Sequence, residues 1–370
     1  MERKRILFIM PALPGGGAEK VLIDILKNFN QEKFEVTLIL IRWKGVYLNQ
    51  IPTFVHVISL DRFIPSSRLL YNRFTSNFWK RYSILRAIGF DRFHTIVSFM
   101  EGESVFYHSF VHKHGQKNVS WVHIDLKENH WSSRFFKSQS HEENCYSKMN
   151  QIVFVSKKAE TQFQNEFNIK IDSRVLYNLI DSDNICRQSN IESVPRNKYF
   201  TVCNVGRLCE QKRQDRLIEA ISILHKQHGL RVECWILGKG DLLESLQQLS
   251  KQLNVDDRVH FLGFKDNPYP FMASSDAFVL SSDTEGYPLV LAEAVCIGKP
   301  IVSTDVTGTK EVLGDDCGFI CSTNSYEIAD AIFRLATNPD LLIDQKNKSL
   351  KRAKSFDVEN VMTQIYDVLS

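Results

Sequence analysis

Apolar runs and amphipathic segments alternate along the whole chain. Runs rich in Val, Ile, Leu and Phe have the length of buried strands, and the segments between them repeat apolar residues at helical spacing. In the first half of the sequence, strands are predicted near 5–11, 34–41, 55–60, 95–100, 119–123, 151–156 and 174–178. Because strands separated by helices form parallel sheets covered by helices, this order predicts an α/β fold.

The alternation stops in the middle of the chain and then starts again. Residues 179–197 show no sustained periodicity and contain Asp, Ser, Asn and Pro side chains, so they are the best candidate for a linker. Beyond them, strands are predicted near 199–205, 232–237, 259–262, 277–281, 300–303 and 319–321. Helices are predicted at about 212–228, 241–253, 288–298, 325–337, 340–353 and 357–369.

Each half therefore has the elements of a doubly wound sheet, in which ligands bind beyond the carboxyl ends of the strands. A chain of 370 residues with 43% hydrophobic side chains is long enough for two such cores. We expect two Rossmann-like domains that face each other across a ligand cleft. Their predicted extents are 1–180 for the first domain, 181–197 for the linker, 198–355 for the second domain and 356–370 for a C-terminal helix that could pack back on the first domain.

Charge is divided unequally between the halves. Residues 1–190 contain 26 Lys and Arg against 18 Asp and Glu, whereas residues 191–370 contain 20 against 25, which together give the net charge of +3. A basic first half is suited to an anionic partner. An ordinary solvated surface that is basic explains the same composition.

The cysteines and the first residues bear on the cellular compartment. The eight cysteines form no C-x-x-C pair and no zinc-like spacing with histidine, so they are expected to be reduced and mostly buried thiols. Residues 1–13 resemble a short signal peptide, but 14–17 lead directly into a helical pattern, as expected after a first strand. No apolar run reaches the length that spans a bilayer. We therefore expect a cytoplasmic protein.

Two glutamates eight residues apart mark the start of a predicted helix in the second half. Strand 277–281 leads into a loop with Glu285 and Gly286, and Pro288 suits the first turn of the helix that carries Glu293. Free N–H groups at this helix start could bind a phosphate, and the two carboxylates could accept hydrogen bonds from sugar hydroxyls. The alternative is that both acids only complement the helix dipole.

A second charged motif closes the first strand of the same half. The sequence Asn-Val-Gly-Arg-Leu-Cys-Glu-Gln-Lys at 204–212 places Arg207 and Lys212 beyond the predicted sheet edge. Two cations there could neutralise a diphosphate leaving group without a metal, Arg207 through its planar fork and Lys212 as a point charge. A salt-bridged surface pair is the alternative interpretation.

Together these motifs resemble those of the retaining glycosyltransferases of family 4, which have the GT-B fold. In the second half the resemblance rests on Gly206-Arg207 with Lys212, Leu237-Gly238-Lys239-Gly240-Asp241, Val259-His260-Phe261-Leu262-Gly263 and the E-x7-E run. In the first half, 14–19 resembles the glycine-rich loop of the family. The resemblance thus covers both halves and points to members of the bacterial polysaccharide and lipid-linked glycan type.

The resemblance implies roles for individual residues of the second half. Arg207 and Lys212 would contact the donor diphosphate. Glu285 would lie by the transferred sugar, and Glu293 would bind the nucleotide ribose. Of the neighbouring residues, Pro288 and Leu289 would contact the diphosphate. Gly286 and Tyr287 would contact the donor sugar.

In the first half, the resemblance implies a catalytic histidine after a late strand. His123 follows the apolar run 119–122 and matches that position, and Asp125 is a rival. A histidine packed at a sheet edge is the alternative. The glycine-rich loop would lie at the cleft, where Gly16 and Gly17 would approach the donor diphosphate or the acceptor.

Two classes of cofactor are disfavoured. Loop 15–17 lacks the G-x-G-x-x-G spacing of dinucleotide sites, and Arg42 and Lys44 stand where such a site has an acid after the second strand. The D-x-D sequence at 181–183 has the form of a metal-binding motif but lies in the predicted linker, where turn-forming residues are expected. We therefore expect no metal and no cofactor, because the nucleotide sugar is a co-substrate.

Residues 62–88 combine aromatic and basic side chains. We interpret one helical face of this segment as core, namely Tyr71, Phe74, Phe78, Tyr82 and Leu85. A basic surface with apolar anchors, suited to an anionic membrane, would be left by Leu69, Arg73, Trp79 and Lys80. A surface helix with stray aromatic residues is the alternative.

These features predict transfer of a sugar from a nucleoside diphosphate donor, with uridine diphosphate favoured, to a glycan or lipid-linked acceptor of cell-surface polysaccharide synthesis. By resemblance, the anomeric configuration is retained, and front-face attack assisted by the leaving phosphate fits the family. The partners would be the donor, the acceptor and an anionic inner membrane face, without nucleic acid. The alternatives are a nucleotide-sugar epimerase of the same fold and a non-catalytic partner subunit, which would not need four converging charged groups.

Overall fold

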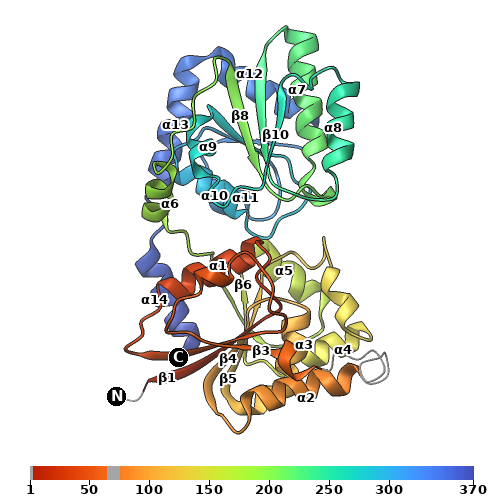
Figure 1. The fold of residues 1–370 in the computed structure, drawn as a ribbon, viewed down its shortest axis with the longest axis vertical. Helices are drawn as coiled ribbons and strands as arrows, with labels where there is room; N and C mark the ends of the chain where they lie inside the picture. The colour runs from red at the N-terminus through yellow and green to blue at the C-terminus, as the bar shows by residue number, and fades with distance from the viewer. Residues whose placement is uncertain (1–2, 65–75) are drawn as a thin grey trace. The chain divides into compact units, whose positions relative to one another are not determined.

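The computed structural model describes residues 3–64 and 76–370, which divide into two compact units. The first unit contains 1–179 and 358–370, and the second contains 180–357. Each unit is a parallel sheet covered by helices (Figure 1). The predicted α/β fold of two Rossmann-like domains is therefore confirmed.

The first unit is built on a seven-stranded sheet with the order β3-β2-β1-β4-β5-β6-β7. All its strand pairs are parallel, and the order reverses beside β1, as in a doubly wound sheet. The strands are β1 (Lys4–Met10), β2 (Phe34–Leu40), β3 (His56–Ser59), β4 (Phe93–Ser98), β5 (Gly115–Val122), β6 (Gln151–Phe154) and β7 (Asp172–Val175). Each lies at a predicted apolar run, so the strand predictions for this half are confirmed.

Helices cover both faces of this sheet. One face carries α2 (Ser76–Ile88), α3 (Glu103–Val111), α4 (Gln139–Tyr146) and α5 (Lys157–Glu166), which share a single buried hydrophobic cluster with the strands. The other face carries α1 (Gly17–Lys27) and the C-terminal helix α14 (Val358–Leu369). Leu7 and Ile9 of β1 point to the first face, and Phe8 between them contacts Phe29 after α1. This alternation is the pleat of a strand buried on both sides.

Helix α14 belongs to the first unit although it is the last element of the chain. The Tyr366 hydroxyl donates to the carbonyl of Asn28 at 3.1 Å and accepts from the backbone N–H of Asn30 at 2.9 Å. Its ring stacks on Phe34 at a centroid distance of 5.0 Å. The helix predicted at 357–369 therefore packs beside the end of α1 (Figure 1).

The second unit is built on a six-stranded parallel sheet with the order β10-β9-β8-β11-β12-β13. Its strands are β8 (Phe200–Val205), β9 (Val232–Leu237), β10 (Val259–Gly263), β11 (Ala277–Leu280), β12 (Ile301–Thr304) and β13 (Phe319–Cys321). Its helices are α6 (Ser182–Ser189), α7 (Gln214–His228), α8 (Leu243–Gln252), α9 (Tyr269–Ser274), α10 (Leu289–Cys296), α11 (Thr309–Leu313), α12 (Ser325–Thr337) and α13 (Pro339–Ala353). Helix α7 packs against α8 and α12, and α10 packs against α6, α11 and α13.

The segment expected to be a linker contains helix α6. The Asp181 carboxylate caps this helix by accepting from the backbone N–H of Asn184 at 2.9 Å. Ile185 is buried, and Cys186 Sγ donates to the carbonyl of Cys296 in α10. Sequence periodicity did not reveal α6, because a helix of eight residues offers too few apolar positions for a pattern.

Our interpretation that the aromatic face of α2 is buried in the core is wrong. Phe78 and Tyr82 are 64% and 42% exposed, and their rings stack on each other. The buried residues of α2 include Ile84 and Ile88, and Leu85 only packs partly against them. The aliphatic pair four residues apart, and not the aromatic one, therefore packs into the buried cluster.

Lys80, predicted on the membrane-facing surface, has its Nζ 5.3 Å from the ring centre of Phe106 on α3. Four residues of the prediction lie outside the described residues, namely Leu69, Tyr71, Arg73 and Phe74. Within 3–64 and 76–370, none of the helices combines the length and the apolar character that crossing a bilayer requires.

The burial of Ile84 and the exposure of Phe78 predict that their removal has different effects on the free energy of unfolding. Ile84→Ala should destabilise the first unit by about 2–5 kcal/mol, because it removes buried methyl groups and leaves a cavity. Phe78→Ala should change stability by no more than about 0.5 kcal/mol, because its ring is solvated. Differential scanning calorimetry of both variants checks this difference. Equal losses of melting temperature would show that the aromatic face is also core.

Candidate functional site

The charged residues predicted near the donor lie on two turns at the carboxyl ends of β8 and β11 in the second unit. After β8 the chain passes Gly206 and Arg207 to a short 3-10 helix at Glu210–Lys212 and then enters α7. The turn after β9 approaches this segment so closely that a Cβ at Gly238 would lie 1.8 Å from the carbonyl oxygen of Gly206. Only glycine fits there, and Gly238 also has a φ of +148°.

Lys212 and Glu285 form a short ion pair between these turns. The Lys212 ammonium lies 2.6 Å from Glu285 Oε1, and the side chains are 15% and 10% exposed. The Ser282 hydroxyl donates to the same oxygen at 2.7 Å. The structure thus joins two residues that the sequence analysis assigned to the diphosphate and to the sugar. Because Oε1 accepts both bonds, Oε2 is the oxygen left for a further donor.

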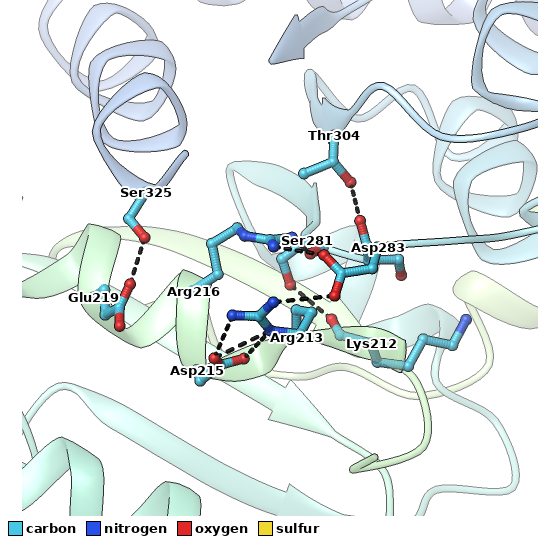
Figure 2. Close-up of polar contacts among 10 residues, drawn as sticks. Lys212, Arg213, Asp215, Arg216, Glu219, Ser281, Asp283, Thr304 and Ser325 are labelled. Carbon is cyan, nitrogen blue, oxygen red and sulfur yellow. Dashed lines mark hydrogen bonds and ion pairs between the residues drawn. The ribbon is translucent and has the colours of Figure 1, made fainter. Parts of the chain in front are cut away.

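Backbone contacts hold the two turns together around this pair. The Gln211 amide donates to the carbonyl of Thr284 at 2.8 Å, and the Asp283 N–H donates to the carbonyl of Gln211 at 2.9 Å. The Ser281 hydroxyl donates to the carbonyl of Lys212 at 3.0 Å (Figure 2). Lys212 is therefore placed by its main chain as well as by its charge.

An arginine network that the sequence analysis missed supports the start of α7 (Figure 2). Arg213 has a left-handed backbone with a φ of 47°, a conformation that costs a non-glycine residue about 1–3 kcal/mol. Its guanidinium bonds Asp215 at 2.9 Å and Asp283 at 3.0 Å. The buried Arg216 bonds the other oxygen of Asp283 at 2.6 Å. Burial raises the pKa of Asp283, but hydrogen bonds from Arg216 and Arg213 outweigh it and lower the pKa below its ordinary value.

Arg207 differs from Lys212 in its surroundings. Its side chain is exposed, and no carboxylate of the described residues forms an ion pair with it. The backbone is fixed, because the Arg207 carbonyl accepts from the Gln214 amide at 3.0 Å. The guanidinium is thus available to an anion from solution, whereas the Lys212 ammonium is paired with Glu285.

The remaining motif residues lie at the start of α10. Pro288 occupies the N-cap position of this helix without a side-chain capping bond, and Leu289 is the first helical residue. A Cβ at Gly308 would lie 2.6 Å from the carbonyl oxygen of Gly286 and 2.8 Å from Cα of Tyr287. Glycine at 308, with a φ of +83°, therefore lets the turn after β12 pack on this loop.

Glu293 lies within α10 and is 6% exposed. Its Oε1 accepts from the hydroxyl of Tyr269 at 3.0 Å, a partner that the sequence analysis did not identify. The carboxylate is therefore held by the protein in the structure described.

In the first unit, the glycine-rich loop enters α1. Gly15 has a φ of +111°, Gly16 is the cap residue and Gly17 begins the helix. A Cβ at Gly16 would lie 2.2 Å from an oxygen of Glu19, which is 7% exposed. The chain thus places its own carboxylate at a helix start, where negative charge is favoured.

His123 follows β5 in the same unit and is 8% exposed. Its ring lies 4.9 Å from that of Phe99. Burial lowers the pKa of His123 to about 3, and the opposing hydrogen bond to the carbonyl of Phe99 is weaker. Nε2 is buried and has no hydrogen-bond partner among the described residues. A neutral imidazole that donates to Phe99 from its other nitrogen presents Nε2 as an acceptor.

Glu101 supports His123 and was missed in the sequence. It is 1% exposed, and its Oε2 accepts from the backbone N–H of His123 at 3.0 Å. Its Oε1 accepts from Trp131 Nε1 at 3.1 Å. Burial raises the pKa of Glu101 above its ordinary value. The only signal in the sequence was an acid directly after the apolar run 95–100.

Asp125, the rival of His123, is fully buried in a turn. Its Oδ1 accepts from the backbone N–H groups of Lys127 at 3.1 Å and Glu128 at 3.3 Å. Burial raises the pKa of Asp125. These contacts give the carboxylate a role in the shape of the loop after His123.

The D-x-D sequence at 181–183 has a structural role, because Asp181 caps α6. Within the described part of the chain, no three His, Cys, Asp or Glu side chains are grouped as a metal site would require.

Two family models match the chain. The model of Glycosyltransferase Family 4 matches residues 15–184, and that of Glycosyl transferases group 1 matches residues 187–354. An uncharacterised glycosyltransferase of Methanocaldococcus jannaschii is 29% identical over 234 residues, which are 53% of this chain and 57% of the relative. The N-acetylgalactosamine-N,N'-diacetylbacillosaminyl-diphospho-undecaprenol 4-alpha-N-acetylgalactosaminyltransferase of Campylobacter jejuni is 33% identical over 186 residues, 50% of this chain and 49% of the relative. The aligned stretches thus span about half of these two relatives.

Among solved structures, the crystal structure of Anabaena HepE in complex with UDP and glucose superimposes with a TM-score of 0.80. The superposition covers 99% of both chains at 22% sequence identity. This likeness concerns the fold.

The environment of His123 makes a titration prediction. Because burial disfavours the imidazolium form, the ring should remain neutral between pH 5 and 8, with its pKa near 3 instead of the ordinary 6.5. Histidine ring NMR spectra recorded across this range, with His123→Asn to identify the resonance, check this. A midpoint near the ordinary value would contradict the buried acceptor described here.

Proposed function

Because the chain belongs to the family 4 glycosyltransferases and has their GT-B fold, we propose that it is a retaining glycosyltransferase. It moves a sugar from a nucleoside diphosphate donor to a glycan or lipid-linked acceptor. The observation that carries this proposal is the ion pair of Lys212 and Glu285 at the carboxyl ends of β8 and β11, where the turn after β8 also carries the exposed Arg207. Ligands of doubly wound sheets bind at this edge.

In the proposed reaction, the bond from the anomeric carbon to the diphosphate breaks, and negative charge develops on the leaving phosphate. The Lys212 ammonium has three donors, of which one meets Glu285, so two are left for phosphate oxygens. Arg207 supplies a planar fork, and the first N–H groups of α10 supply further donors. These fixed groups stabilise the leaving charge without reorganisation.

Two acceptor atoms are proposed to bind sugar hydroxyls. Glu285 Oε2 is left free by the bonds to Oε1, and His123 Nε2 is an unpartnered acceptor among the described residues. The low pKa of His123 keeps the ring neutral at physiological pH. Its Nε2 therefore accepts a hydrogen bond from a sugar hydroxyl, and the ring adds no positive charge. We assign neither residue as a nucleophile. The acceptor hydroxyl attacks from the face that the diphosphate leaves, its oxygen bonds the anomeric carbon, and its proton passes to the leaving phosphate.

The donor is proposed to be a uridine diphosphate sugar, and the enzyme to work without a metal or another cofactor. The first point is supported by the UDP in the complex of HepE, whose fold this chain shares. The second is supported by Lys212 and Arg207, which provide the positive charge that a divalent ion supplies elsewhere.

The acceptor is proposed to be linked to a lipid at the inner membrane face. The Campylobacter relative, by its name, acts on a sugar attached to diphospho-undecaprenol. On α2 of this chain, the exposed Phe78 and Tyr82 lie beside the exposed Arg81 and Arg86. Apolar rings next to cations suit an anionic membrane surface.

The transfer proposal predicts the effect of removing each cation. Lys212→Ala and Arg207→Ala should each lower kcat by about 100-fold or more, because each removes a donor to the leaving phosphate. Release of nucleoside diphosphate from UDP-sugars, measured with and without acceptor and in excess chelator, is the assay. The exposed Lys251 provides the matched control Lys251→Ala, which should keep the wild-type rate.

Wild-type turnover in both site variants would exclude the assigned roles. Acceptor-independent release by the wild type would favour the epimerase alternative, and absence of release with every donor would favour a non-catalytic subunit. Loss of activity in chelator that magnesium or manganese restores would exclude metal independence.

The membrane proposal predicts salt-dependent binding to vesicles. The protein should sediment with vesicles of anionic lipid and dissociate as salt rises, since the attraction is screened within about 8–10 Å at physiological ionic strength. Arg81→Glu with Arg86→Glu should weaken this binding and leave transfer to a short soluble acceptor unchanged. The same charge change in Lys33→Glu with Lys170→Glu, at exposed sites elsewhere in the first unit, is the control. Equal losses in both double variants, or equal binding to neutral vesicles, would contradict a membrane role for α2.

A further inference from the structure

A rigid platform follows the loop that bears His123. The 3-10 helix Trp131–Phe135 is tied to two buried carboxylates from different elements. Trp131 Nε1 donates to Glu101 at 3.1 Å, and the Ser132 hydroxyl donates to Glu142 at 3.0 Å. Glu101 is 1% exposed and Glu142 is 0% exposed. The platform is thus fixed at two points to the interior of the protein.

Arg134 lies on this platform with its guanidinium held by two rings. The carbon Cζ is 5.1 Å from the ring centre of Trp131 and 5.0 Å from that of Phe135. The side chain is exposed, and no acid of the described residues forms an ion pair with it. The surrounding segment 131–140 also contains no Asp or Glu that could pair with Arg134. The result is a pre-oriented cation whose charge the protein leaves unneutralised.

The platform stands at the ligand-binding edge of the first sheet. Glu101, which follows β4, accepts from both the Trp131 indole and the backbone of His123. A Cβ at Gly102 would lie 3.0 Å from atoms of both Ser132 and Phe135, so the platform packs directly on the turn after β4. Ligands of doubly wound sheets bind beyond the carboxyl ends of the strands.

We propose that Arg134 binds a phosphate group of the acceptor. A guanidinium presents paired N–H donors that match phosphate oxygens, is less strongly hydrated than an ammonium, and stacks on aromatic rings. Contact with the rings of Trp131 and Phe135 reduces the conformational freedom that binding would otherwise remove. We assign the donor diphosphate to Arg207 and Lys212 of the second unit, and the anion bound at Arg134 to the second substrate. This inference rests on the proposed transfer reaction and narrows the acceptor to one that carries phosphate beside its sugar.

The test compares two soluble acceptors with the same glycan, one attached through a diphosphate to a short alkyl chain and one attached to that chain directly. Arg134→Gln should raise KM for the diphosphate acceptor at least about tenfold, since a bond between charged groups is lost. It should leave KM for the neutral acceptor and for the donor unchanged. Lys137→Gln removes the same charge three residues away without ring contacts and should have little effect. Arg134→Lys should be intermediate, because it keeps the charge and loses the fork.

Equal effects of Arg134→Gln on both acceptors, or equal effects of the Arg134 and Lys137 variants on the diphosphate acceptor, would overturn the proposal. A wild type without turnover would contradict the proposed function and not this site. In that case, binding of inorganic diphosphate is measured by calorimetric titration in the presence of saturating uridine diphosphate. The proposal requires that Arg134→Gln weaken this binding. Arg134→Gln should also sediment with anionic vesicles like the wild type. Loss of sedimentation with an unchanged acceptor KM would assign the guanidinium to a lipid headgroup.

Discussion

The proposed chemistry depends on the ion pair between Lys212 and Glu285, which joins two turns 73 residues apart in the sequence. Both side chains are largely buried, and breaking a buried pair by removing one partner typically costs about 3–5 kcal/mol. The Gln211 side-chain amide ties the same turns by donating to the carbonyl of Thr284, and Arg213 has a strained conformation at the start of α7. The fold thus holds a pre-oriented ammonium at the edge of the second sheet, on the same turn that carries the exposed Arg207.

Most of the fold could be predicted because parallel strands buried on both faces are continuous apolar runs. Strand β9 at Val232–Leu237 and β13 at Phe319–Cys321 were placed to the residue. Helix α6 and the aliphatic face of α2 could not be predicted in this way. In α6 a single cap, Asp181, defines the start, and in α2 two faces satisfy the same periodicity until contact with α3 selects Ile84 and Ile88.

Only part of the candidate site could be predicted from the sequence. Spacing and charge identified Lys212 and Glu285, but their contact arises from loop conformations, such as the left-handed Arg213, that no periodicity reports. Glu101 looked like any acid after a strand, because its importance lies in complete burial beneath His123 and Trp131. The contact of Arg134 with two rings likewise depends on the turn that brings Trp131 and Phe135 near its guanidinium.

The most direct test of the central claim is calorimetric measurement of the affinities for uridine and for uridine diphosphate. In the wild type the diphosphate should tighten binding markedly, because Lys212 and Arg207 bind its oxygens. In the double variant Lys212→Ala with Arg207→Ala, this gain should largely disappear while the affinity for uridine persists, as a double-mutant comparison requires. If the diphosphate increases the affinity over that of uridine by the same factor in the wild type and in the double variant, the account is contradicted.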